Sequence, residues 1–173
     1  MKIKNIKNMH NGYYNLQKLE IENSYGKIFE RELFVNKDGV CTLLYNTTTQ
    51  KYIFVKQWRP ANNDYVIECV GGSIESGETD YTAITKEVFE ETGYNIIPPI
   101  KIMEFYVSPG AITEKVSLFY TETTNKVKET LGVDDEEIEL IEMDISEIKN
   151  YTFIDAKTII AINNINEYKS NRI

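Results

Sequence analysis

The chain has 173 residues, which suffices for one domain with a substantial hydrophobic core, or for a domain with a small extension. Its formal net charge of −8 argues against a nucleic-acid backbone as the main partner, because such a partner calls for a basic surface. A small phosphorylated ligand remains compatible with this charge, since a bound divalent cation can invert the local potential.

The N-terminal segment and the two cysteines indicate the compartment. The first residues, MKIKNIKNMHNGYY, carry positive charge but no apolar segment, so we expect no secretory signal. No apolar run approaches the roughly 20 residues that a membrane helix needs. Cys41 and Cys69 lie far apart in apolar runs and form no CxxC pair, which favours buried free thiols over a disulfide or a metal site. We therefore expect a cytoplasmic protein without a membrane partner.

Residues 1–37 look different from the rest, being polar and tyrosine-bearing, with a strand pair possible around 23–27 (NSYGK). We interpret them as a small β extension that packs on the main domain, 38–173, or on a partner subunit. Enrichment in β-branched and aromatic residues predicts further strands, and the polar segment 46–51 predicts a hairpin between two of them. The expected strands are 27–35, 40–46, 52–58, 65–70, 101–107, 115–123 and 138–143.

Helices are expected at three places. The first covers 80–92, with Thr79 or Asp80 as N-cap and Gly93 just past the end. A short helix is expected at 146–151. The last is predicted from about Asp155 to Tyr168, and its broad apolar face comprises Ala156, Ile159, Ile160, Ile162 and Ile165. Strands with few helices predict an α+β fold, with a mixed β-sheet packed between helices as an α/β/α sandwich.

Three carboxylates crowd one side of the first predicted helix. Glu87 lies three and four residues before Glu90 and Glu91, so all three project from neighbouring points, whereas Ile84 and Val88 are offset toward the core. Like charges at this spacing repel, so they form either a solvated acidic face or a site for a cation. Clustered hard oxygen ligands suit Mg²⁺ or Mn²⁺ bound together with substrate phosphates.

The segment before this helix suits a cation site. Gly71 and Gly72 permit a tight turn after the preceding strand, where a backbone carbonyl can reach the same metal. Gly72, five residues, Glu78, seven residues and then KEVFEETGY (86–94) resemble the Nudix box. That pattern is Gly, five variable residues, Glu, seven variable, Arg-Glu, an aliphatic residue, one variable, Glu-Glu, one variable, Gly and a hydrophobic residue. Every fixed position matches except the arginine, where Lys86 stands.

The resemblance to Nudix hydrolases implies a metal site of two or three Mg²⁺ ions, with Mn²⁺ as a possible substitute. It assigns Glu87 and Glu91 as catalytic metal ligands, Glu90 as an auxiliary ligand and the Gly71 carbonyl as a further ligand. Glu78 and residue 86 support the loop in this family. Because lysine lacks the planar fork of arginine, Lys86 loosens that support without removing a ligand.

The flanks narrow the resemblance to the nucleoside-diphosphate-sugar pyrophosphatase group. QWRPANNDYVIECVGG (57–72) and YVSPGAITEKVSLFYTE (106–122) look like segments of the ADP-ribose and nucleotide-sugar enzymes. GVDDEEIELIEMDISE (132–147) and IDAKTIIAI (154–162) resemble the GDP-mannose pyrophosphatase branch, where a lysine also precedes the first metal glutamate. The resemblance covers residues 27–168.

Candidate substrate residues lie in these flanks. Arg59, before Pro60, either grips a diphosphate or forms a surface salt bridge. Glu68 would be costly if buried alone, so we expect it to face the cleft. Glu114 follows a Ser-Pro-Gly loop that is either a substrate cover or a plain turn, and it supplies a substrate contact or a further ligand. The resemblance aligns Glu136 with a general base, whereas a solvated loop also explains its acidic run.

These features predict Mg²⁺-dependent hydrolysis of the pyrophosphate bond of a nucleoside diphosphate sugar, GDP-mannose-like or ADP-ribose. A nucleoside monophosphate and a sugar phosphate are the expected products. A non-catalytic nucleotide-sugar sensor on the same fold, and a Nudix enzyme acting on nucleoside triphosphates, stay open as alternatives. The resemblance also implies a homodimer in which the N-terminal extension crosses between subunits.

Overall fold

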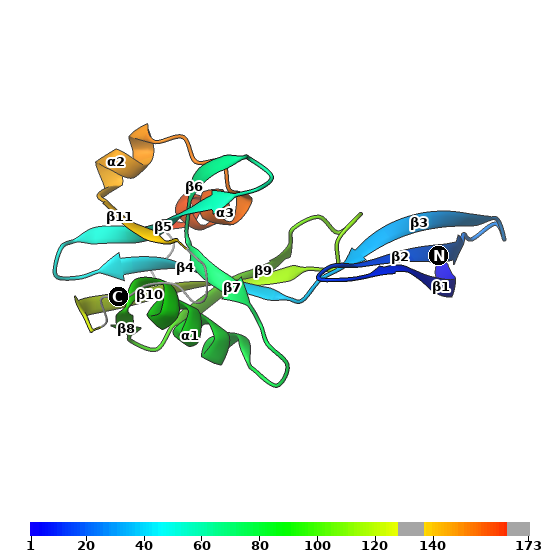
Figure 1. Ribbon diagram of the computed structural model, residues 1–173, viewed down its shortest axis with the longest axis horizontal. Helices are drawn as coiled ribbons and strands as arrows, with labels where there is room; N and C mark the ends of the chain where they lie inside the picture. The colour runs from blue at the N-terminus through cyan, green and yellow to red at the C-terminus, as the bar shows by residue number, and fades with distance from the viewer. Residues whose placement is uncertain (128–136, 166–173) are drawn as a thin grey trace. The chain divides into compact units, whose positions relative to one another are not determined.

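The computed structural model describes residues 1–127 and 137–165. The chain forms two compact units. Met1–Asp38 and Phe105–Val116 make up the first, which we call the N-terminal unit, and Gly39–Glu104 with the chain from Ser117 onward makes up the second, the main unit. Figure 1 shows the order of the elements along the chain.

The N-terminal unit contains a three-stranded antiparallel sheet in the order β1-β2-β3. The strands are β1 (Lys2–Asn11), β2 (Asn15–Glu22) and β3 (Ile28–Val35). The β2–β3 turn falls at the predicted position 23–27, whereas β1 was not predicted. The pairing of β1 with β2 has two register shifts. Polar and apolar residues therefore do not alternate along β1, and this alternation is the signal that identifies a strand in a sequence.

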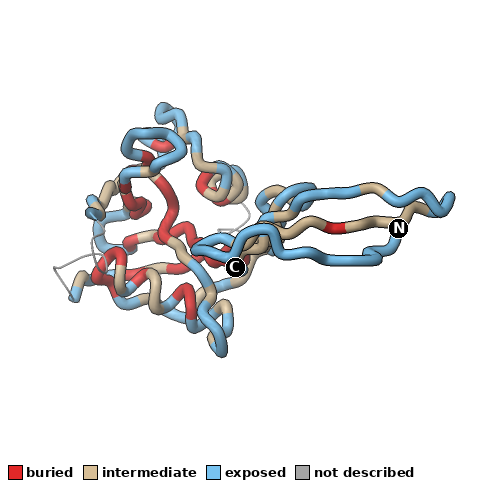
Figure 2. Tube along the Cα trace, turned by 45° about the vertical axis from the view of Figure 1, so that its right-hand side comes forward, coloured by how far each residue is buried: buried red, intermediate tan, exposed pale blue. Residues whose placement is uncertain are grey.

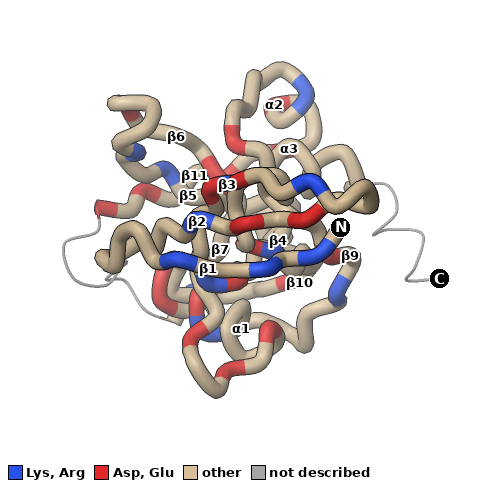
Figure 3. Tube along the Cα trace, turned by 90° about the vertical axis from the view of Figure 1, so that its right-hand side faces the viewer, with Lys and Arg blue, Asp and Glu red and all other residues tan. Residues whose placement is uncertain are grey.

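The two faces of this small sheet differ in chemistry. Ile3 and Phe29 lie opposite Ile21, so apolar side chains share one face. The other face carries charge, as in the Lys18–Glu30 ion pair at 2.6 Å. All residues of β1 are exposed, as the pale tube of Figure 2 shows, and Figure 3 shows lysines along this strand.

The main unit is built on a sheet whose central order is β11-β5-β4-β10-β8, with β6 paired to β5, β7 to β4 and β9 to β10. Several pairings are antiparallel, including the hairpin predicted at 46–51 between β4 and β5. The strand bounds are β4 (Gly39–Asn46), β5 (Lys51–Arg59), β6 (Asp64–Glu68), β7 (Val70–Ser73), β8 (Tyr94–Ile96), β9 (Ile100–Tyr106), β10 (Lys115–Lys126) and β11 (Glu139–Met143).

Helix α1 (Asp80–Thr92) covers one side of this sheet, and α2 (Ile145–Asn150) and α3 (Ala156–Asn163) lie on the other side (Figure 1). The ends of α1 are those predicted: Thr79 accepts a hydrogen bond from the Thr82 N–H as N-cap, and Gly93 follows with φ 73°. The core between sheet and helix comprises Val40, Leu44, Ile53, Val55, Val70, Ala83, Ile84, Val88, Tyr94 and Phe119.

Two predictions about elements were wrong in detail. The strand predicted at 65–70 divides at Cys69, because the Cys69 N–H donates to Thr158 Oγ1 at 2.7 Å while β6 pairs with β5 and β7 pairs with β4. In α3, Thr158 and Ala161 are buried, whereas Ile159 is 39% exposed. Because Thr158 accepts the hydrogen bond from Cys69, α3 faces the sheet with Thr158 and Ala161 and not with Ile159.

Both cysteines are free and buried, as predicted. The pKa of the Cys41 thiol is raised well above its usual value by a hydrogen bond with Cys69 and by burial. Such thiols are poor nucleophiles at neutral pH. In the described parts of the chain, no helix is long and apolar enough to span a membrane.

Candidate active site

The site begins at the two glycines of β7, which runs antiparallel to β4 with Gly71 opposite Cys41. A Cβ on Gly71 would collide with the carbonyl oxygen of Val40. A Cβ on Gly72 would lie 2.6 Å from Glu87 Oε1. Glycine at 71 therefore lets the backbone of β7 approach β4, and glycine at 72 leaves the Glu87 carboxylate of α1 in its place beside β7.

Glu91 meets the same backbone from the next turn of α1. The Gly71 N–H donates to Glu91 Oε2 at 3.2 Å, and the Gln57 side-chain amide donates to Glu91 Oε1 at 3.0 Å. Glu91 is 7% exposed and Gln57 6%, so both groups are withdrawn from solvent. A buried carboxylate is stable when its oxygens accept hydrogen bonds, and here both oxygens do so.

Lys86 lies between two of the acidic residues. Its Nζ is 3.5 Å from Glu78 Oε1 and 3.8 Å from Glu87 Oε1. Burial lowers the pKa of Lys86, but the charges of Glu87, Glu78 and Glu90 outweigh it and raise that pKa. Glu78 also accepts the Glu75 N–H at 3.0 Å, which closes the loop before the helix. The supporting contact implied by the resemblance is therefore formed by lysine, through single point contacts.

A chain of alternating charges lies beside this cluster. Arg59 Nε and Nη2 donate to the two oxygens of Glu68 at 2.7 and 2.9 Å, a bidentate pair. Lys157 Nζ lies 3.8 Å from Glu68 Oε2 and 2.8 Å from Asp155 Oδ1. Glu68 is 5% exposed, so the cost of its burial is offset by two cations from different elements. The sequence left two roles open for Arg59, a diphosphate contact and a salt bridge. The structure shows the salt bridge.

Glu114 lies in the N-terminal unit, where residues 108–115 run along the end of β3. Phe34 and Ile112 form a parallel bridge, and the Phe34 N–H donates to the Ala111 carbonyl at 2.8 Å. The side-chain amide of Asn36 donates to Glu114 Oε2 at 2.8 Å. The carboxylate is thereby held on the loop that follows Ser-Pro-Gly. Glu136, the expected general base, lies outside the described residues.

The oxygen atoms near Gly71 and Gly72 are chemically suited to bind a divalent cation. Carboxylate and carbonyl oxygens are the ligands that Mg²⁺ takes, and the bare Cα of Gly72 leaves the Glu87 carboxylate the space that a Cβ would fill. Within residues 1–127 and 137–165, no three His, Cys, Asp or Glu side chains are gathered into a ready metal cage. Mg²⁺ ordinarily keeps several waters and relies on substrate phosphates, so it needs no such cage.

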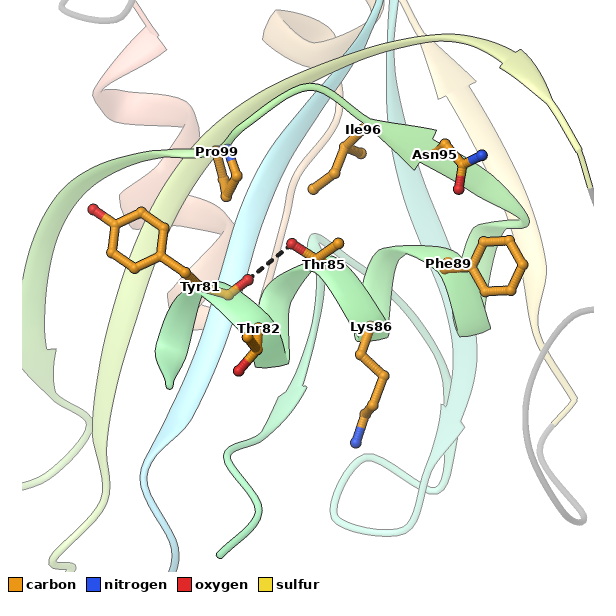
Figure 4. Close-up of a pocket in the computed structure, with 8 residues that line it drawn as sticks. All are labelled: Tyr81, Thr82, Thr85, Lys86, Phe89, Asn95, Ile96 and Pro99. Atoms are coloured by element: carbon orange, nitrogen blue, oxygen red, sulfur yellow. Dashed lines mark hydrogen bonds between the residues drawn. The ribbon is translucent and has the colours of Figure 1, made fainter. Parts of the chain in front are cut away.

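A second feature of α1 is an open groove of about 740 Å³ on its other flank. Figure 4 shows Tyr81, Thr85 and Phe89 along one stripe of the helix, with Ile96 and Pro99 facing them, whereas Lys86 points away. The dashed line marks the 2.8 Å bond from Thr85 Oγ1 to the Tyr81 carbonyl. Glu87 and Glu91 are out of step with Tyr81, Thr85 and Phe89 in the helical repeat, so the carboxylates and the groove lie on different sides of the helix.

Comparisons with known proteins assign the fold and the family. The model of the NUDIX domain matches residues 35–161, which contain the glycines and glutamates described above. The chain belongs to the Nudix family. The resemblance and the α+β Nudix fold expected from the sequence are confirmed, and a crystal structure of an "ADP compounds hydrolase" has the same fold. That structure has a TM-score of 0.82 at 15% identity, covering 99% of this chain and 95% of the other.

Curated relatives share more sequence. A "GDP-mannose pyrophosphatase" of Cronobacter sakazakii is 33% identical over 148 residues, covering 79% of this Nudix chain and 77% of the relative. One of Salmonella typhimurium is 34% identical over 146 residues, with 78% and 76% coverage. One of Escherichia coli O9:H4 is 32% identical over 167 residues, with 90% and 85% coverage.

Sequence reasoning missed three residues that the structure brings to these clusters. Gln57 was expected in a strand and in the segment that resembles nucleotide-sugar enzymes, with no role of its own. The available signal was a polar residue in step with Val55 on a buried face. Lys157 lay at the predicted start of α3 with no visible partner. Asn36 gave no signal, because its bond to Glu114 joins segments 78 residues apart.

Proposed function

We propose that this Nudix protein hydrolyses the pyrophosphate bond of a nucleoside diphosphate sugar, GDP-mannose-like or ADP-ribose, to a nucleoside monophosphate and a sugar phosphate. The observation that carries the proposal is the convergence of Glu87 and Glu91 on the Gly71-Gly72 backbone. The names of the curated relatives, at 32–34% identity over most of the chain, support the substrate class.

In this proposal Glu87, Glu90 and Glu91, with the Gly71 carbonyl, hold two or three Mg²⁺ ions, which Mn²⁺ can replace. When bound, these ions would neutralise the diphosphate and lower the pKa of an attacking water. Glu91 enters the reaction already oriented, since both its oxygens accept hydrogen bonds. Glu87 is held between the Gly72 backbone and Lys86. The protein thus presents a fixed row of oxygens, which limits reorganisation during the reaction.

Substrate contacts in the proposal come from the charged residues of the flanks. Arg59 has further guanidinium N–H groups beyond the two that bind Glu68, and these are suited to a diphosphate oxygen. Glu68 then acts mainly by fixing the Arg59 fork. Glu114 contributes a polar substrate contact from a loop that Asn36 braces. Glu136 accepts the proton of the attacking water as general base.

We propose further that residues 1–37 form a dimerisation extension to the hydrolase domain, 38–173, and that the protein works as a cytoplasmic homodimer. The apolar face of the β1–β3 sheet supports this, because Ile3 and Ile6 are each 53% exposed on it. Replacing both by aspartate should give monomers in light scattering after gel filtration. Ile28→Asp is the control, since Ile28 is 57% exposed but lies on the charged face.

The activity is tested with purified protein, Mg²⁺ or Mn²⁺, and a panel of GDP-mannose, other nucleotide sugars, ADP-ribose and nucleoside triphosphates. Anion-exchange chromatography should resolve a nucleoside monophosphate and a sugar phosphate from one or more diphosphate substrates. Reaction in ¹⁸O-labelled water then identifies the phosphorus attacked, by the product that carries the label. If no compound of the panel is hydrolysed with either metal, the proposal is refuted. Turnover of nucleoside triphosphates alone would favour a Nudix enzyme that acts on triphosphates.

A further inference from the structure

We propose that Gln57 is a positioning residue that fixes Glu91 for cation binding, an inference that rests on the proposed function. Gln57 lies on β5, a strand outside the Nudix box, and its side-chain amide reaches Glu91 Oε1 at 3.0 Å. The contact joins residues 34 positions apart. Together with the bond from the Gly71 N–H of β7, it ties the end of α1 at Glu91 to the main sheet.

Hydrogen bonds on both oxygens orient the Glu91 carboxylate. Gln57 donates to Oε1 and the Gly71 N–H donates to Oε2. The rotation of the carboxylate about its last bond is therefore restrained by donors on both sides. A free carboxylate at this point would have to give up rotational freedom each time a cation bound.

The absence of charge on Gln57 matters as much as the length of its side chain. A lysine or arginine here would bind Glu91 as a competing cation, because two unit charges 3–4 Å apart attract strongly in a partly buried site. A carboxylate would repel Glu91 or become a further ligand. An amide donates one hydrogen bond and adds no charge, so Glu91 keeps its full negative charge for the metal.

The alternation along β5 explains why this strand supplies the group. Val55, Gln57 and Arg59 are spaced by two and therefore point to one face. Val55 enters the core, Gln57 binds Glu91, and Arg59 binds Glu68. Within five positions, one face of β5 thus supplies a core residue, a hydrogen-bond donor to the proposed metal ligand Glu91, and the proposed phosphate-binding residue Arg59. This arrangement agrees with the proposed reaction.

A structural role alone would also explain a buried, paired glutamine, so the test has to separate positioning from stability. Gln57→Met removes the amide and keeps a similar length. Gln57→Asn keeps the amide but is one methylene too short to reach Glu91, and it decides the matter if the methionine variant does not fold. Gln17→Met is the matched control, because its amide binds Asn8 at 3.1 Å on the exposed N-terminal sheet.

The measurement is the binding of Mn²⁺ alone to the full chain, followed by the electron paramagnetic resonance signal of free Mn²⁺. Loss of groups that orient metal ligands typically weakens affinity 10–100-fold, and we expect at least about tenfold for both Gln57 variants and none for Gln17→Met. Thermal unfolding without metal is recorded in parallel. Unchanged or tighter Mn²⁺ binding by folded Gln57 variants would overturn the inference.

Steady-state kinetics give a second readout on whichever substrate the wild type hydrolyses. The Mg²⁺ concentration for half-maximal rate should rise about tenfold or more, while the substrate KM at saturating Mg²⁺ changes less than about threefold. A purely structural role would instead lower the rate equally at all Mg²⁺ concentrations. If the wild type hydrolyses nothing in the panel, the proposed function fails, and Mn²⁺ binding still decides the role of Gln57.

Discussion

The Glu87 carboxylate occupies the space in which any residue other than glycine would carry its Cβ at position 72. An added Cβ would lie within 2.6 Å of both carboxylate oxygens. Real side-chain atoms do not approach this closely, so either the carboxylate or β7 would have to move. The glycine of the Nudix box thus acts here by leaving room for a ligand of the proposed metal site. Its backbone has no positive φ that would otherwise require glycine.

Gly72→Ala should therefore lower kcat/KM by about 100-fold or more, since a displacement of about 1 Å in a catalytic constellation has effects of this size. The free energy of unfolding should change little, because Gly72 is partly exposed and the Glu87 side chain can rotate outward. Gly110→Ala is a control for the effect of the substitution on stability, since its added Cβ meets nothing within 4 Å. A Gly72→Ala variant with wild-type kinetics would contradict the placement of Glu87.

Glu91→Gln should leave the protein folded but reduce turnover at least about 1,000-fold, because a metal ligand loses its charge. A smaller effect on stability follows from the hydrogen bonds. Glu91 accepts from Gln57 and from the Gly71 N–H, whereas a glutamine offers one oxygen and one NH₂ group. One donor then faces another donor, and unfolding free energy should fall by about 1–3 kcal/mol in urea titrations without metal. Wild-type rates in this variant would remove Glu91 from the metal site.

Much of this region was predictable because its signals are local. The ends of α1 follow from Thr79 and Gly93, whose capping geometry depends on a few neighbouring residues. The spacing of Glu87 and Glu91 on one helical face follows from the periodicity alone. Such features are fixed within one or two turns of chain, and the structure agrees with them closely.

What could not be predicted depends on contacts between distant segments. The break at Cys69 arises because α3 supplies Thr158 as an acceptor 89 positions away, which no local pattern announces. The Glu68 carboxylate was expected to face a cleft, and the structure adds that Arg59 binds it and Lys157 approaches it. Its role in substrate binding stays a prediction. Pairings of this kind become visible only once the chain is folded.

Asp155 should make stability depend on acid pH. Burial raises the pKa of Asp155, but the charge of Lys157 and hydrogen bonds from Lys157 and Thr158 outweigh it, so that the pKa is lowered overall. A carboxylate with a lowered folded-state pKa contributes stability above its unfolded pKa, about 3.9, and loses it as pH falls through the folded value. Asp155→Asn should therefore cost about 1–2 kcal/mol at pH 7 and progressively less below about pH 4.

The measurement is urea unfolding of both proteins from pH 7 down to pH 3. Asp64→Asn is the control, because Asp64 is exposed and accepts only the neighbouring Tyr65 N–H among its described bonds. A stability difference for Asp155→Asn that stays constant down to pH 3 would show that the charge of Asp155 contributes nothing. The asparagine still caps α3, so the helix itself should persist.

Glu68→Gln tests whether the Arg59 fork is held ready for a diphosphate. The variant keeps the size of the side chain but loses one of the two charge-assisted hydrogen bonds, leaving Arg59 free to swing toward solvent. We expect a rise in substrate KM of about tenfold with a smaller change in kcat, because orientation of a phosphate-binding cation is lost. Arg59→Lys, which keeps the charge without the fork, should have a similar effect.

The control is an ion pair between β5, the strand of Arg59, and its neighbour β11. Lys56 Nζ pairs with Glu139 Oε2 at 2.8 Å in a solvent-exposed ion pair, and such pairs contribute little. Glu139→Gln should leave KM within about twofold of the wild type and stability within about 0.5 kcal/mol. If Glu68→Gln matches Glu139→Gln in KM while Arg59→Lys raises KM, Arg59 binds substrate without needing Glu68. The Glu68 carboxylate then serves only to neutralise Arg59 and Lys157.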